Sequence, residues 1–298
     1  MTLNSQAYQK HKMKLSIADL IIQIKNCNYD YIINKTRKYQ SGSVGPADMT
    51  INCFLVEEIA KPKGKTIEDV EGWNWCIADN GEIYLYHIYG KNQVGSLIKW
   101  NKDFSVADAW AIDTFNESGL EISIKFFIII RHILWYAIIQ KDGIMLHSSA
   151  ISYKGEGILF SAPSGTGKST QSALWKKEFG DEVTIVNDDT PFIRNINGKS
   201  YVYGCPWSGK TDINEQMKVP VKAVVSVKQG NENSVKELTP TEGFFRIFNE
   251  TKKPVESNML DKAMDNVINF LSNTKVYELT CKPEKEAVYA LQKVLIKD

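Results

Sequence analysis

The run GILFSAPSGTGKST, residues 157–170, combines the residue types that a polyphosphate-binding loop needs. It fits the P-loop (Walker A) pattern G-x-x-x-x-G-K-[ST] at every position except the first, where Ala162 replaces glycine. Gly165 and Gly167 permit backbone conformations that side chains forbid, so successive N–H groups can point at one anion. A helix beginning near Lys168 would add the positive end of its dipole. The run therefore predicts a nucleotide site.

Two residues of this loop have specific expected roles. Lys168 would reach the β- and γ-phosphates, and the Ser169 hydroxyl would bind Mg²⁺. The alternative is a glycine turn that carries a lysine by chance. The context favours the P-loop, because an apolar strand precedes it and a helical run, residues 171–179, follows it. The residues expected to contact the nucleotide are Ala162, Pro163, Ser164, Gly165, Thr166, Gly167, Lys168, Ser169 and Thr170.

Two adjacent carboxylates follow the next predicted strand. The β-branched run 183–186 leads through one asparagine to Asp188 and Asp189. Mg²⁺ requires oxygen ligands near the phosphates, so one carboxylate could hold the metal. The other could accept the proton of an attacking hydroxyl. The alternative is an Asp-Asp turn that caps a strand.

A histidine lies upstream of the loop. Residues 143–152 are expected to form a strand that contains His147, and the turn 154–156 leads into the strand before the P-loop. Such a hairpin would place His147 beside the loop, within reach of the γ-phosphate. Because its unperturbed pKa lies near neutrality, a histidine there could assist proton handling. The alternative is a core histidine bonded to the backbone.

Together these residues resemble the kinase domain of HPr kinase/phosphorylase, which shares a fold group with ATP-dependent phosphoenolpyruvate carboxykinase. The resemblance covers about residues 143–192. It implies that His147 is an active-site residue, that Asp188 is the catalytic base and that Asp189 is its acidic neighbour. Lys168 would neutralise charge during transfer, and Ser169 with Asp189 would fix the metal.

The resemblance implies an ATP- and Mg²⁺-dependent kinase that phosphorylates a hydroxyl, expected to be serine, of a peptide or protein. A glycine-rich second signature after the Asp pair is missing, and Thr170 stands where an acidic residue commonly follows the loop serine. These departures argue against HPr itself as the acceptor and favour a likeness to peptide-tailoring kinases, such as those acting on lasso-peptide precursors. The alternatives are a nucleotide-binding regulatory module without transfer and, less favoured, a carboxykinase.

Composition limits the partners and the compartment. The 298 residues are 43% apolar and 24% charged, with a net charge of +1, as in an ordinary globular protein. No strong field selects nucleic acid or an anionic membrane, so neither is expected as a partner. The five scattered cysteines form no C-x-x-C pair, and the polar N-terminus does not resemble a signal peptide. A cytoplasmic protein is expected, and a homo-oligomer is left open.

The expected fold class is α/β (α+β). Residues 1–115 should form a β-rich region, and residues 116–298 a P-loop kinase domain with a mixed sheet of the carboxykinase-like type. The run 124–140 could be mistaken for a membrane span, but Arg131 and His132 interrupt it. A helix over residues 118–140, capped by Asn116 or Ser118, should instead lie buried against a sheet.

The remaining segments supply strands, helices and one polar loop. Hairpins are expected over residues 73–87 and 191–203, a strand over 219–228, helices within 239–272, a strand over 276–279 and a helix over 282–297. The loop 204–216 would meet the acceptor, with Lys210 either near the transferred group or solvated. Arg246 should pair with Glu242 and Glu250 at helical spacing, with a phosphate role as the alternative.

Overall fold

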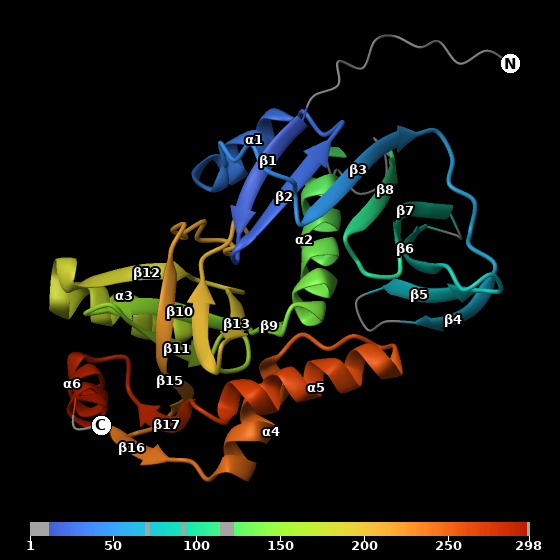
Figure 1. The fold of residues 1–298 in the computed structure, drawn as a ribbon. Helices are drawn as coiled ribbons and strands as arrows, with labels where there is room; N and C mark the ends of the chain where they lie inside the picture. Colours follow the sequence, from blue (N-terminus) through green and yellow to red (C-terminus); the bar gives the residue numbers. More distant parts are fainter. Residues whose placement is uncertain (1–11, 69–71, 91–92, 114–121, 297–298) are drawn as a thin grey trace, which may run out of the picture. The chain divides into compact units, whose positions relative to one another are not determined.

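The computed structural model describes residues 12–68, 72–90, 93–113 and 122–296 (Figure 1). These residues fall into two compact units, Met1–Gln140 with Val255–Ser257 and Lys141–Pro254 with Asn258–Asp298. The predicted domain boundary between residues 115 and 116 lies outside the described residues.

Among the described residues of the first unit, eight strands form one sheet in the order β1-β2-β3-β8-β7-β6-β5-β4. The strands are β1 (Lys12–Ile17), β2 (Leu20–Lys25), β3 (Met49–Val56), β4 (Gly64–Glu68), β5 (Trp73–Ala78), β6 (Ile83–Tyr89), β7 (Gln93–Trp100) and β8 (Val106–Ile112). Two pairs, β2–β3 and β3–β8, are parallel. Ala18 and Asp19 both take positive φ in the β1–β2 turn, which matches the right-handed twist of a hairpin. The described residues between 12 and 113 are therefore rich in strands.

The helices of this unit are α1 (Asp30–Thr36) and α2 (Ile122–Gln140), with a short 3-10 turn at Arg37–Tyr39. By length and composition alone, α2 is apolar enough to cross a membrane, but 78% of its most apolar stretch is buried in the protein. It packs against β7 and β8. The expected burial of this helix against a sheet is confirmed, whereas the expected caps Asn116 and Ser118 lie outside the described residues.

In the described part of the second unit, nine strands form a mixed sheet. The path runs β12-β10-β11-β15-β14-β13-β9, and β17 and then β16 extend from β15. The strands are β9 (Gly143–Met145), β10 (Ser148–Tyr153), β11 (Glu156–Ser161), β12 (Val183–Asn187), β13 (Phe192–Ile196), β14 (Lys199–Tyr203), β15 (Lys218–Gln229), β16 (Ser234–Glu237) and β17 (Lys275–Cys281). Because β11, β15 and β17 are mutually parallel, their carboxyl ends meet at one edge.

Helices cover both faces of this sheet (Figure 1). They are α3 (Lys168–Phe179), α4 (Pro240–Glu250), α5 (Ser257–Leu271) and α6 (Lys285–Leu295), with a 3-10 turn at Gly180–Glu182 after α3. Along β11, Phe160 packs with Trp175 of α3 and Leu291 of α6, whereas Leu159 packs with Ile247 of α4 on the other face. Alternate strand residues thus enter opposite cores, as the two-residue period of a strand requires. The chain has a mixed α and β fold.

Trp175 is the anchor of the core beneath α3. Its side chain is fully buried and contacts the rings of Tyr153 and Phe179. Replacing Trp175 with alanine should lower the free energy of unfolding by about 3–5 kcal/mol, because the core cannot refill the volume. Urea unfolding followed by circular dichroism measures this loss. Phe245→Ala is the control, since Phe245 is 58% exposed and its removal should change stability by about 0.5 kcal/mol or less. Equal losses in both variants would contradict the assigned core.

Candidate active site

The loop at residues 162–169, named the P-loop after the sequence pattern that it matches, connects the end of β11 to the start of α3. Gly165 and Gly167 adopt φ values of 79° and 116°, which belong to the region that favours glycine. A Cβ added at either position would meet no atom within 4 Å. Backbone conformation rather than crowding therefore requires glycine at both positions. Ser169 and Thr170 lie exposed on the first turn of α3, where a ligand on the loop can reach them.

Lys168 folds back over the loop that carries it. Its side chain is buried, and Nζ donates hydrogen bonds to the carbonyl oxygens of Ala162 at 2.7 Å and Pro163 at 3.3 Å. Burial lowers the pKa of Lys168, and the carboxylates of Glu250 and the Asp188–Asp189 pair partly oppose this shift. The structure therefore brings the P-loop lysine and the acidic pair together. A desolvated ammonium group of this kind gains from an anionic ligand.

Asp188 is held at the end of β12 by a chain of buried hydroxyl groups. The hydroxyl of Ser149, in β10, donates to Asp188 Oδ1 at 2.5 Å. Ser149 Oγ also lies 2.6 Å from Ser172 Oγ in α3. Because Ser149 gives its single proton to the carboxylate, Ser172 must be the donor in the second bond. The chain orients Asp188 from two neighbouring elements and leaves Oδ2 for another partner.

Asn187 shapes the turn that carries the acidic pair. Its buried Oδ1 accepts hydrogen bonds from the backbone N–H groups of Asp189 at 3.0 Å and Thr190 at 2.9 Å. Its Nδ2 donates to the carbonyl oxygens of Cys205 at 3.0 Å and Trp207 at 3.2 Å. One side chain thus fixes the turn and ties it to the following loop.

The polar loop 204–216 lies beside Asp189. Gly209 has φ of 67°, and a Cβ there would lie 3.0 Å from Cγ of Asp189. Thr190 Oγ1 donates to Asp189 Oδ2 at 3.2 Å. Lys210 follows Gly209 and is exposed. The expected contact of this loop with the acceptor and the expected task of Lys210 stay predictions.

The expected single strand through His147 is wrong. The chain breaks there into β9, which pairs with β13, and β10, which pairs with β11 and β12. His147 lies between the two strands because the chain changes pairing partners at this point. Its N–H donates to the carbonyl oxygen of Glu250 at 3.0 Å, and its Nδ1 lies 3.1 Å from Glu250 Oε2. His147 remains adjacent to the P-loop strand, since Ser161 Oγ donates to its carbonyl oxygen at 3.0 Å.

The expected pairing of Arg246 is also wrong. Arg246 bonds Glu278 of β17 at 2.8 Å. Glu242 instead closes a capping box with Thr239 at the start of α4 and pairs with Lys236. Glu250, at the end of α4, turns to His147. Tertiary contacts have replaced the local helical pairs, which stabilise a helix by only about 0.2–0.5 kcal/mol each.

The oxygen donors at this site suit Mg²⁺, which takes few protein ligands and completes its shell with phosphate and water. Ser169 supplies a hydroxyl and Asp189 a carboxylate. Among the described residues, no group of three or more His, Cys, Asp or Glu is arranged as a metal cluster. A two-residue set of this kind depends on a bound polyphosphate to complete the coordination.

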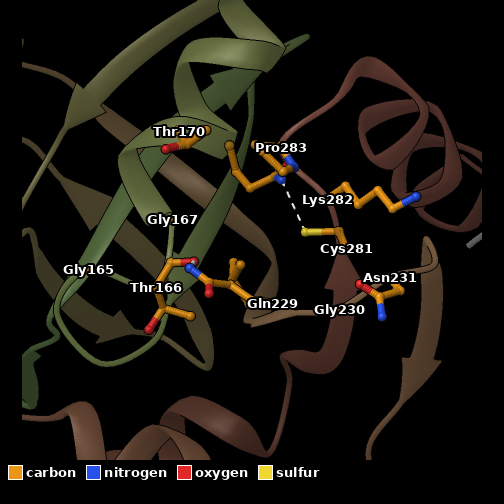
Figure 2. Close-up of a pocket in the computed structure, with 12 residues that line it drawn as sticks. Gly165, Thr166, Gly167, Thr170, Gln229, Gly230, Asn231, Cys281, Lys282 and Pro283 are labelled. Carbon is orange, nitrogen blue, oxygen red and sulfur yellow. Dashed lines mark hydrogen bonds between the residues drawn. The ribbon is translucent and has the colours of Figure 1, made fainter.

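A pocket of about 720 Å³ opens beside the P-loop (Figure 2). Gly165, Thr166, Gly167 and Thr170 form one side, and the other side comes from residues 229–231 at the end of β15 and 281–283 at the end of β17. Gln229 Nε2 donates to the Thr166 carbonyl oxygen at 3.4 Å and links the two sides. The pocket lies at the carboxyl ends of parallel strands, the edge at which open α/β sheets bind ligands.

Comparisons with known proteins add a family to this geometry. Residues 113–292 match the family model described as SynChlorMet cassette protein ScmC. The chain belongs to the ScmC family. Among solved structures, this ScmC-family chain is similar to the HPr(Ser) kinase/phosphatase from Coxiella burnetii, with 12% identity and a TM-score of 0.30, over 51% of this chain and 97% of that one. No curated protein matches its sequence.

Four residues at the site of this ScmC-family protein were not found from sequence. They are Ser149, Ser172, Asn187 and Glu250. Asn187 had a signal, because it directly precedes the acidic pair at the end of a predicted strand, where an asparagine commonly bonds the backbone two residues on. Ser149, Ser172 and Glu250 had none, since only the folded sheet brings them to Asp188 and His147.

The hydroxyl chain of the ScmC-family site makes a graded prediction. Ser149→Ala removes a buried bond to a carboxylate and should cost about 1.5–3 kcal/mol of stability. Ser172→Ala removes a bond between two neutral hydroxyl groups and should cost about 0.5–1.5 kcal/mol. Urea unfolding of both variants measures the order. A larger loss for Ser172→Ala would contradict the direction of the chain.

Proposed function

We propose that this ScmC-family protein is a kinase that transfers the γ-phosphoryl group of ATP to a hydroxyl, with serine as the expected acceptor, of a peptide or protein. The observation that carries the proposal is the charge arrangement at Lys168. The charge of the buried Lys168, at the start of α3, interacts with the carboxylates of Glu250 and of the Asp188–Asp189 pair, which directly follows β12. A P-loop lysine beside paired acids is the arrangement that binding and transferring a phosphoryl group requires.

The chain offers a place for each part of ATP. The loop amides from Ala162 to Ser169 and the Lys168 ammonium would hold the β- and γ-phosphates. The pocket between Thr166 and residues 229–231 would take the nucleoside, because it continues directly from the loop glycines. Ser169 and Asp189 would hold Mg²⁺, which neutralises phosphate charge when bound.

Asp188 would act as the base. Its Oδ1 is occupied by Ser149, so Oδ2 would take the proton of the acceptor hydroxyl. The hydroxyl oxygen forms a bond to the γ-phosphorus, the bond from that phosphorus to the β–γ bridging oxygen breaks, and ADP leaves. Lys168 and the loop amides would neutralise the charge that develops on the transferred group. Most of the rate would come from positioning and charge, as expected for phosphoryl transfer.

The loop 204–216 is the proposed contact for the acceptor. It is tied to the acidic turn through Asn187, and it presents the exposed residues Lys210 and Ile213 next to Asp189. A net charge of +1 offers no field for nucleic acid or an anionic membrane, so a peptide or protein in the cytoplasm is the proposed partner. A protein that only sensed nucleotide would have no need of an oriented base.

Lys168→Met tests the nucleotide site. Mg-ATP at 100 times its Kd should stabilise the wild-type protein by about 2.7 kcal/mol, and the variant should lose this gain. Because burial lowers the pKa of Lys168, the charged form opposes folding near neutral pH. The ligand-free variant should therefore be at least as stable as the wild type, and the wild type should recover relative to it as pH rises through the folded-state pKa.

Thermal unfolding with and without Mg-ATP measures both effects of Lys168→Met. Lys177→Met is the matched control, because this exposed lysine of α3 has no role in the proposed site and should leave the nucleotide-induced stabilisation intact. Equal stabilisation of the wild type and Lys168→Met by Mg-ATP would overturn the nucleotide site.

Asp188→Asn tests the transfer. The amide keeps the shape of the side chain and can still accept from Ser149, so Mg-ATP should bind as before. Without the base, kcat should fall by about 10²- to 10⁴-fold. ADP release and mass spectrometry of a pool of serine-containing peptides measure the reaction. The exposed Asp181→Asn serves as control and should keep full activity.

Two outcomes would contradict this assignment. Binding without turnover in the wild type would indicate a nucleotide sensor. Near-native transfer by Asp188→Asn would show that the base is another group.

A further inference from the structure

Glu250 is a charged residue of the site to which the proposed reaction gives no task. It ends α4, a helix that begins far from the P-loop in sequence. Its Oε2 lies 3.1 Å from Nδ1 of His147, and the two side chains are 17% and 33% exposed respectively. Among the carboxylates that act on the pKa of Lys168, Glu250 has the largest effect. Glu250 therefore affects the pKa of Lys168 at least as much as Asp189 does.

The side-chain pair is not needed to anchor α4. Backbone bonds already join the two segments, from the N–H of His147 to the Glu250 carbonyl oxygen at 3.0 Å and from the N–H of Lys252 to the Met145 carbonyl oxygen at 3.0 Å. A bridge between Leu146 and Thr251 adds to them. Because the backbone holds the helix end in place, the contact between Glu250 and the imidazole ring serves another purpose. It fixes the orientation of the ring and determines which nitrogen carries the proton.

The chemistry of the contact determines which nitrogen carries the proton. A carboxylate can only accept hydrogen bonds, so Nδ1 of His147 must donate to Glu250. In the neutral ring, Nε2 is then an acceptor. No described residue bonds Nε2. The second nitrogen is left for a ligand at the P-loop site, in the same way that an orienting carboxylate fixes the working nitrogen of a catalytic histidine.

We propose that Glu250 is a positioning residue of the phosphoryl-transfer site, an inference that rests on the proposed function. Its carboxylate holds the His147 ring with the proton on Nδ1, so that Nε2 accepts a hydrogen bond from a backbone N–H of the acceptor peptide beside the reacting hydroxyl, whose own proton points to Asp188. This contact aims the hydroxyl oxygen at the γ-phosphorus, while Asp188 takes the proton. Glu250 acts through His147 and touches neither nucleotide nor acceptor.

The ring tautomer gives a test that needs no activity. The chain has four histidines, so ¹⁵N labelling of histidine gives a spectrum with few signals. The signals that disappear in the His147→Gln variant are those of His147. At a pH where the ring is neutral, His147 should carry its proton on Nδ1 in the wild type. Glu250→Ala should move the proton to Nε2, and Glu250→Gln, which keeps an acceptor oxygen, should largely retain it on Nδ1. Asn249→Ala, an exposed neighbour on the last turn of α4, should change nothing.

Kinetics then test the positioning role. Glu250→Ala should lower kcat by about 10- to 100-fold, as losses of orienting partners do, with the KM for ATP unchanged. Glu250→Gln should restore most of that loss. Thermal unfolding should show all variants folded, because the backbone bonds at His147 remain.

The outcomes separate the two proposals. An unchanged tautomer in Glu250→Ala overturns the positioning role, and so does an altered tautomer with full kcat. A higher KM for ATP without loss of kcat would show that Glu250 acts on nucleotide binding instead. A wild-type protein that binds Mg-ATP but transfers nothing to any peptide contradicts the proposed function itself, and the positioning role falls with it.

Discussion

The desolvation of the Lys168 ammonium group is the constraint on which the site depends. Removing an ammonium group from water is costly unless opposite charge and hydrogen-bond acceptors compensate. Here the Ala162 and Pro163 carbonyl oxygens accept its hydrogen bonds, and the carboxylates of Glu250 and the Asp188–Asp189 pair supply opposite charge. The pKa of Lys168 remains lowered nevertheless, so compensation is incomplete. A site that retains this cost gains most when an anion enters it.

The sheet of the second unit explains how such distant charges meet. The P-loop follows β11, and the antiparallel strand β10 lies between β11 and β12. Ser149 of β10 therefore bonds Asp188, which directly follows β12. Parallel β15 and β17 end at the same edge and form the far wall of the pocket. The end of α4 is hydrogen-bonded to the break between β9 and β10, and these bonds place Glu250 beside His147. Each charge is thus placed by a strand end or a helix end, where backbone bonds restrict its position.

Local patterns were enough to predict the elements and the loop, and they were insufficient for the contacts between them. The P-loop glycines, the helix at Lys168 and the acidic pair after a β-branched strand follow from residue type and short spacing, because backbone conformation and capping are local. The hairpin at Asn197–Gly198 formed for the same reason.

The contacts that sequence missed join residues far apart in the chain. His147 pairs with Glu250, about a hundred positions away, and Arg246 pairs with Glu278, about thirty positions away. Such pairings depend on strand order, which spacing within one segment does not encode. The uniform strand expected through His147 failed because one chain can pair with different neighbours on either side of a single residue.

The bonds of Lys168 to its own loop also bear on nucleotide affinity. The ammonium group already has carbonyl acceptors before any ligand arrives, so a phosphate must replace these bonds rather than simply add to them. The net gain would be the difference between bonds from the ammonium group to a charged phosphate and its existing bonds to neutral carbonyl oxygens. Under the proposed function, the nearby carboxylates would oppose an incoming polyanion, and a divalent cation at Asp189 would offset their charge. If the proposed function holds, the site would favour the metal-bound nucleotide over the free one, because only the metal-bound form brings positive charge to offset Asp188, Asp189 and Glu250.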